Sequence, residues 1–189
     1  MDFVWHSGPP WYRTGFGQQA GMVLNSLAAL DYRFVVSSPE PPQEGLAGVP
    51  YLPSPELSGR DLARNTHAAF SGASSRPRAI AFVNSERIAD DLCEDLDLVL
   101  WLPFNFSPPP RRLRSYIASR GPTQVLALTN WAQSSLKENG IESTYMPHGV
   151  DRSVFTPAPD RGIVMRERLG LGRGAFVAGF VGANNEWFG

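Results

Sequence analysis

The chain has little of what marks several classes of protein. Its 189 residues include one cysteine, Cys93, which excludes an internal disulfide, and no Cys or His pattern has metal-site spacing. The net charge is −1, so no overall positive charge indicates binding to nucleic acid or an anionic membrane. No apolar run approaches a membrane span, and residues 1–5 lack the features of a signal peptide. We therefore expect a cytoplasmic protein without a metal ion.

Short apolar runs alternate with helical patterns along most of the chain. Hydrophobic residues make up 42% of it, enough for a core of its own. A stripe from Ala20 to Ala28 has the spacing of a helix packed on a sheet, and another helix is expected after Pro110. This alternation predicts a Rossmann-like, three-layer α/β/α fold with a mostly parallel sheet. The runs that predict strands are residues 2–5, 33–37, 79–83, 98–102 and 125–128.

A long loop, residues 6–17, follows the first predicted strand and contains Gly15-Phe16-Gly17. A Gly-x-Gly between a strand and a helix lets the backbone approach a ligand, and the helix N-terminus offers N–H groups to an anion. The alternative is that these glycines serve only a tight turn. The motif is not the dinucleotide fingerprint, because the loop is too long and no acidic residue ends the second strand.

Residues 124–151 predict a βαβ unit. Asn130 is the expected N-cap of a helix that ends at Gly140, and a short strand over 143–146 leads into Pro147-His148-Gly149-Val150-Asp151. Since ligands in such folds bind at the carboxyl ends of strands, we expect Thr129, Asn130 and His148 on one rim. The loop 103–110 follows the strand predicted at 98–102, so we expect it on the same rim.

Two motifs in this region resemble a known family. N-W-A-x-x-S-L-x-x-x-G, from Asn130, and M-P-H-G-V-D-x-x-x-F-x-P, from Met146 to Pro157, are similar to the junction between the two domains of GT-B glycosyltransferases. The similarity is greatest to the retaining, family 4-like group that includes sucrose synthase-like enzymes and mannosyltransferases.

The resemblance implies how the chain is divided. Residues 1–152 correspond to the N-terminal, acceptor-side Rossmann-like domain, and 153–174 to an interdomain linker and a helix, for which Asp160 is the expected cap. Residues 175–189 correspond to the first strand of a C-terminal, donor-binding domain, of which the remainder is missing. We therefore expect the chain to fold but to transfer no sugar by itself.

The resemblance also implies an activity, that of a hexosyltransferase. Such an enzyme moves a sugar from a nucleotide-sugar donor to an acceptor hydroxyl, with retention, and needs no cofactor or metal. Its partners would be the nucleotide sugar, the acceptor and the missing C-terminal domain. The residues expected to line the cleft are Gly15, Phe16, Gly17 and Gln18 near the donor phosphates, Asn105, Asn130 and Trp131 on the acceptor side, and His148 and Gly149 at the floor.

Several points stay open. His148 can instead be a structural histidine that closes its turn, and Asp151 is expected to cap the turn after it. Asn105 and Phe106 replace an Asp-Gly pair of the family, which puts an acidic role there in doubt, although the Asn105 amide can bind a sugar hydroxyl. The family's phosphate-binding basic residues and acidic pair belong to the second domain, so the catalytic residues are unknown.

Two other functions are compatible with the same architecture. One is half of a nucleotide-sugar epimerase, which would need clustered acidic and histidine residues that the sequence does not show. The other is a non-enzymatic Rossmann-like module that binds a sugar or a partner protein. Neither the donor nor the acceptor can be identified, and a sugar, a lipid, a protein or a modified DNA base all remain as acceptors.

Overall fold

The computed structural model describes residues 1–42, 48–83, 96–103, 106–120, 124–172 and 174–179. The chain divides into two compact units, residues 1–149 (unit 1) and residues 150–189 (unit 2). The sequence also predicts a short helix capped by Ser85, and this segment lies outside the described residues.

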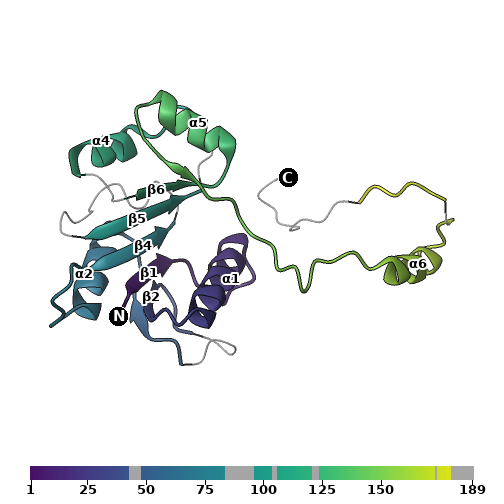
Figure 1. The fold of residues 1–189 in the computed structure, drawn as a ribbon, viewed down its shortest axis with the longest axis horizontal. Coiled ribbons are helices and arrows are strands. Elements are labelled where there is room, and N and C mark those ends of the chain that lie inside the picture. The colour runs from purple at the N-terminus through teal and green to yellow at the C-terminus, as the bar shows by residue number, and fades with distance from the viewer. Residues whose placement is uncertain (43–47, 84–95, 104–105, 121–123, 173, 180–189) are drawn as a thin grey trace. The chain divides into compact units, whose positions relative to one another are not determined.

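Unit 1 is built on a seven-stranded sheet in which every neighbouring pair is parallel (Figure 1). The strand order is β3-β2-β1-β4-β5-β6-β7, so the direction in which strands are added reverses between β1 and β4. The predicted Rossmann-like three-layer α/β fold is confirmed. The strands are β1 (Phe3–Ser7), β2 (Phe34–Ser38), β3 (Tyr51–Pro53), β4 (Arg78–Phe82), β5 (Asp97–Leu102), β6 (Gln124–Ala127) and β7 (Thr144–Tyr145).

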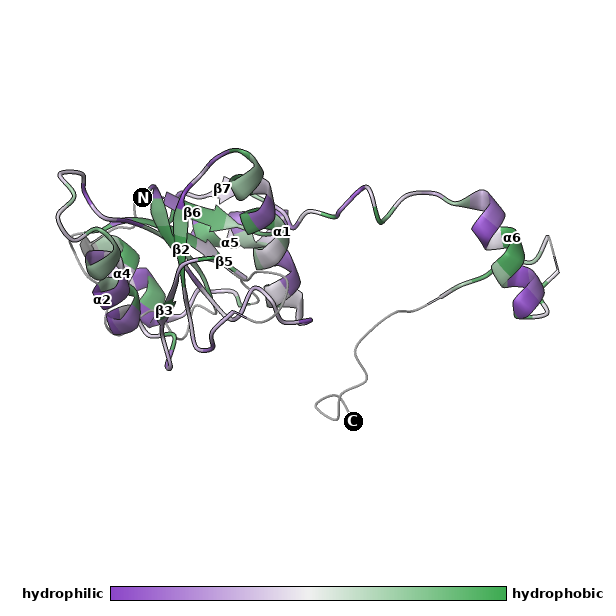
Figure 2. Ribbon diagram, turned by 90° about the horizontal axis from the view of Figure 1, so that it is seen from below, coloured by the Kyte–Doolittle hydropathy of each residue, from purple (hydrophilic) through white to green (hydrophobic). Residues whose placement is uncertain are grey.

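Helices cover both faces of the sheet. On one face α1 (Gly15–Ala29) buries Ala20 and Leu24 against Trp5, Phe82 and Trp101. The other face packs against α2 (Gly59–Ala69), α4 (Arg111–Arg120) and α5 (Asn130–Glu138), which contribute Leu62, Leu113 and Leu136 to a second core. Figure 1 shows α1 and α2 on opposite sides of β1. The hydropathy colours in Figure 2 place much of the hydrophobic sequence in the central strands.

The first strand is longer than the sequence predicts. We expected a loop from His6 onward, but β1 continues to Ser7 and both side chains are fully buried. His6 keeps this place because its Nδ1 lies 2.9 Å from the hydroxyl oxygen of Ser37 on β2, so the buried ring has a polar partner.

The sequence of residues 60–70 predicts a short surface helix, but the helix found there, α2, packs against the sheet. Leu62, Thr66 and Phe70 are buried as their spacing indicates, but Asp61 and Asn65 are buried too. The carboxylate of Asp61 accepts a hydrogen bond from the Ser54 hydroxyl and pairs with Arg64 at 2.8 Å. These contacts allow a polar helix face to pack against the sheet.

The start of α5 differs from the prediction by one residue. Thr129, not Asn130, is the N-cap, and its hydroxyl accepts a hydrogen bond from the Ala132 amide at 3.0 Å. Thr129 has the extended backbone of an N-cap residue, whereas Asn130 is already helical. The predicted end is confirmed: after α5 stops at Glu138, Gly140 takes a positive φ of 76°.

Unit 2 contains one described helix, α6 (Pro159–Arg168), which has no buried residue. Asp160 is not its cap: Ala158 holds that position without a side-chain hydrogen bond, and Pro159 opens the helix. Asp151 does cap its turn, with Oδ1 accepting from the Ser153 amide at 2.8 Å. Residues 174–179 form no strand, and the rest of the strand predicted there lies outside the described residues.

The part of the chain that the structure describes contains no helix both long and apolar enough to cross a membrane. In the same residues, no three His, Cys, Asp or Glu side chains gather in a group that could hold a metal ion.

Candidate functional site

The order of the strands indicates where a ligand would bind. In open parallel sheets, ligands bind beyond the carboxyl ends of the strands at the point where the strand order reverses. Here that point lies between β1 and β4. The segment between Ser7 and Gly15 leaves the carboxyl end of β1, and Phe82 ends β4. We call the carboxyl ends of β1, β4, β5, β6 and β7, with the residues that follow them, the carboxyl rim.

Gly15, Phe16, Gly17 and Gln18 lie on this rim in the first turn of α1, whereas the sequence predicts a loop that continues through Gly17. Thr14 is the N-cap, and its hydroxyl accepts a hydrogen bond from the Gly17 amide at 3.0 Å. Gly15 and Gln18 are exposed, and Phe16 packs on Phe82 with ring centroids 5.1 Å apart. The amide groups at the start of a helix have no partner within it, so those of Gly15 and Phe16 are available to a ligand.

Gly17 has a structural reason to be glycine. It is buried, and a Cβ on it would overlap the carbonyl oxygen of Tyr12 and lie 2.7 Å from that of Pro9. A Cβ on Gly21, one turn later, would likewise lie 2.8 Å from the Pro10 carbonyl oxygen. The close approach that the Gly-x-Gly motif predicts is therefore made at Gly17 by the chain's own backbone. Gly15 has no neighbour within 4 Å of its Cβ position, so that side of the motif is open.

The loop before α1 is held at two aromatic residues. The Trp11 and Tyr51 rings meet edge to face with centroids 6.3 Å apart, and the Tyr12 hydroxyl donates a hydrogen bond to the Glu40 carboxylate. Burial, with a smaller contribution from Glu40, raises the pKa of Tyr51. These contacts fix the loop against β3 and the segment that follows β2.

His148 and Gly149, the last residues of unit 1 in sequence, lie beside the start of α1 and the end of β4. The His148 ring meets those of Phe82 and Trp101 nearly at right angles, with centroid distances of 5.9 Å and 6.1 Å. The carbonyl of Gly149 accepts a hydrogen bond from the Gln19 side chain at 3.1 Å. The structure thus brings the first turns of α1 together with His148 and Gly149.

The chemical state of His148 follows from this packing. Its partial burial lowers the pKa of the imidazole below the ordinary value of 6.5. Near neutral pH the ring is therefore uncharged, with one nitrogen that donates and one that accepts a hydrogen bond. An uncharged imidazole can exchange hydrogen bonds with a hydroxyl group of a ligand, but it carries no positive charge to attract an anion.

The other predicted residues are less closely joined to this group. Asn130 and Trp131 open α5, directly after β6, and both are exposed, Trp131 by 52%. Among the described residues, no ring contact or hydrogen bond connects either side chain to His148. Asn105 lies outside the described residues. Within the described residues, the acceptor side of the predicted cleft thus consists of two exposed side chains at the start of α5.

Three residues of this group were not singled out by the sequence. Phe82 and Trp101 were assigned to buried strands, and only their positions at strand ends indicate a second role. Gln19 lies 130 residues before its partner Gly149, and no local pattern indicates such a contact.

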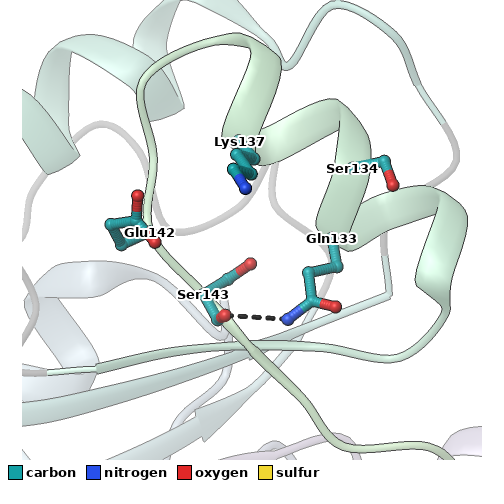
Figure 3. Close-up of a pocket in the computed structure, with 5 residues that line it drawn as sticks. All are labelled: Gln133, Ser134, Lys137, Glu142 and Ser143. Carbon is teal, nitrogen blue, oxygen red and sulfur yellow. Dashed lines mark hydrogen bonds between the residues drawn. The ribbon is translucent and has the colours of Figure 1, made fainter.

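A separate pocket lies outside the carboxyl rim (Figure 3). Its cavity of about 310 Å³ is lined by Gln133, Ser134 and Lys137 of α5 and by Glu142 and Ser143, which precede β7. The Gln133 side chain donates to the Ser143 carbonyl at 3.0 Å and closes one side. Because Ser143 comes before β7, this pocket is at the amino end of that strand and is not part of the site described above.

Comparison with models of known protein families finds no match to this chain, and comparison with curated proteins also finds none.

Proposed function

We propose that this chain is the N-terminal, acceptor-side part of a glycosyltransferase that moves a hexose from a nucleotide sugar to an acceptor hydroxyl with retention. The observation that carries the proposal is the meeting of the first two turns of α1 with the segment of His148 and Gly149 where the strand order reverses. The motif that contains His148 is the part of the sequence that resembles the GT-B junction, and it lies where a ligand of this fold would bind.

Each part of the carboxyl rim has a role that suits a diphosphate sugar. The start of α1 carries unpaired amide groups and the positive end of a helix dipole, which attract phosphate. The exposed, uncharged imidazole of His148 can exchange hydrogen bonds with a sugar hydroxyl. Trp131 presents an exposed ring, 52% accessible, on which the apolar face of a sugar can rest.

The reaction needs more than this rim. Departure of a nucleotide diphosphate requires a cationic anion sink, and the developing positive charge at the sugar carbon requires a nearby negative group. We assign both tasks to a second domain and name no catalytic residue in this chain. The role of unit 1 is then to bind and orient substrates beside the start of α1.

The proposal is tested by measuring, with calorimetry, how tightly uridine and guanosine diphosphate sugars bind to the purified 189-residue chain. Since one hydrogen bond contributes on the order of 1 kcal/mol, His148→Ala should weaken binding about five- to tenfold. Gln133→Ala, in the separate pocket, is the control and should leave binding unchanged. Equal binding by the wild type and His148→Ala would contradict the assignment of the site, and sugar transfer by this chain alone would contradict the assignment of the chemistry to a second domain.

A further inference from the structure

The segment 146–149 follows the last strand of unit 1 and is held at both ends. At its start the Met146 amide donates to the Ala127 carbonyl at 2.8 Å, and the Trp101 indole Nε1 donates to the Met146 carbonyl at 3.2 Å. At its end the Gln19 side chain donates to the Gly149 carbonyl at 3.1 Å. The contacts come from β6, β5 and α1, so three elements hold four residues.

These contacts matter because the segment has little else to hold it. It forms no regular secondary structure, and all four of its residues are exposed. An exposed segment without regular structure keeps its conformational freedom unless specific contacts offset the entropy of fixing it. Between the two ends, the position of the His148 ring against Phe82 and Trp101 depends on the backbone on either side of it.

We propose that Gln19 is a positioning residue, which holds the carbonyl of Gly149 and so keeps the His148 ring on Phe82 and Trp101. The chain then leaves unit 1 at a fixed point, and the joint with unit 2 begins at Val150, whose side chain is 68% exposed. The inference depends on contacts within unit 1 and does not require the proposed enzymatic activity.

The chemistry of the Gln19 side chain fits this role. Its amide nitrogen is the donor to Gly149, while its Oε1 is buried and makes no hydrogen bond in the part of the chain that the structure describes. The bond to Gly149 is thus what orients this amide. Gln18, the preceding residue on α1, is exposed and supplies a matched control.

Methionine is similar to glutamine in volume but cannot donate, so Gln19→Met removes the hydrogen bond and keeps the bulk. Gln18→Met makes the same change at the exposed neighbour. Two NMR measurements on the labelled 189-residue chain distinguish them: the backbone order parameters of His148, Gly149 and Val150, and the titration of the His148 ring.

In the wild type, the order parameter should remain at about 0.85 through Gly149 and fall from Val150 onward. In Gln19→Met it should fall below about 0.6 at His148 and Gly149, and the pKa of His148 should rise toward its ordinary value as the ring becomes hydrated. Gln18→Met should change neither quantity. The proposal is overturned if Gln19→Met behaves as Gln18→Met does, or if the wild type is already disordered at His148.

Discussion

The Nδ1 atom of His6 lies 2.9 Å from the hydroxyl oxygen of Ser37 on the neighbouring strand, and both side chains are fully buried. Burial lowers the pKa of His6 to about 4, although the backbone of Leu57 and the carboxylate of Asp61 favour the charged ring. The unfolded chain therefore takes up a proton at His6 near pH 6.5, while the folded chain does so only near pH 4.

We expect the stability of unit 1 to decrease as the pH falls from about 6.5 to about 4, because between these values the unfolded state binds the additional proton. Each pH unit in this window lowers the free energy of unfolding by up to about 1.4 kcal/mol, so the whole loss is on the order of 3 kcal/mol. Urea unfolding at several pH values measures it. His6→Gln should lose this part of the pH dependence, and an unchanged slope in the variant would assign it to other groups.

Asn65→Ala should destabilise unit 1 by about 2–3 kcal/mol. The Asn65 side chain is buried and donates to the Ser37 hydroxyl at 2.8 Å and to the Pro53 carbonyl at 3.0 Å, so its loss removes both hydrogen bonds and the packing of a buried side chain. Denaturant unfolding compares it with Asn25→Ala on the exposed side of α1, for which we expect a change within about 0.5 kcal/mol. Similar costs for the two variants would show that the buried hydrogen bonds do not contribute.

The two glycines of the Gly-x-Gly motif should respond differently to alanine. Gly17→Ala forces a methyl group against the backbone of Tyr12 and Pro9, and should cost about 2–3 kcal/mol. The methyl group of Gly15→Ala meets no atom within 4 Å, so it causes no clash. Alanine is also the better helix former, so this variant should be as stable as the wild type or more stable by less than about 1 kcal/mol. Thermal unfolding of both variants is the measurement. Equal stability of Gly17→Ala and Gly15→Ala would contradict the close packing of Pro9 and Tyr12 against Gly17.

The cap of α5 gives another matched pair of variants. Thr129→Ala removes the hydroxyl that accepts from the Ala132 amide, and should cost about 1 kcal/mol. Asn130→Ala replaces the first helical residue and should be close to neutral. Chemical unfolding of the two variants decides between the caps. A larger loss of stability in Asn130→Ala than in Thr129→Ala would show that Asn130, as the sequence predicts, is the N-cap.

The sheet was predictable because its strands are buried on both faces and appear as short apolar runs. The run at residues 98–102 and β5 differ by one residue, and the parallel direction follows from the helices between strands. His6 was misassigned for the opposite reason, since a polar residue ends such a run unless a distant partner satisfies it. That partner, Ser37, is not visible in the local sequence.

The candidate site was predictable where position along the chain decides it. His148 and the start of α1 both follow strands, and the carboxyl ends of parallel strands share one rim. Gln19, Phe82 and Trp101 were missed because their importance comes from tertiary contacts, which a single sequence does not encode in any fixed spacing. Gly17 was singled out for a ligand, yet its lack of a side chain is required by the loop that packs against it.

Chemical-shift mapping of the labelled 189-residue chain during titration with uridine and guanosine diphosphate sugars tests the central claim most directly. We expect the largest changes at Gly15, Gln18, His148 and Gly149, with Gln133 and Ser143 of the separate pocket unaffected. Changes confined to the separate pocket, or none at millimolar ligand, would contradict the assignment of the carboxyl rim as the substrate site.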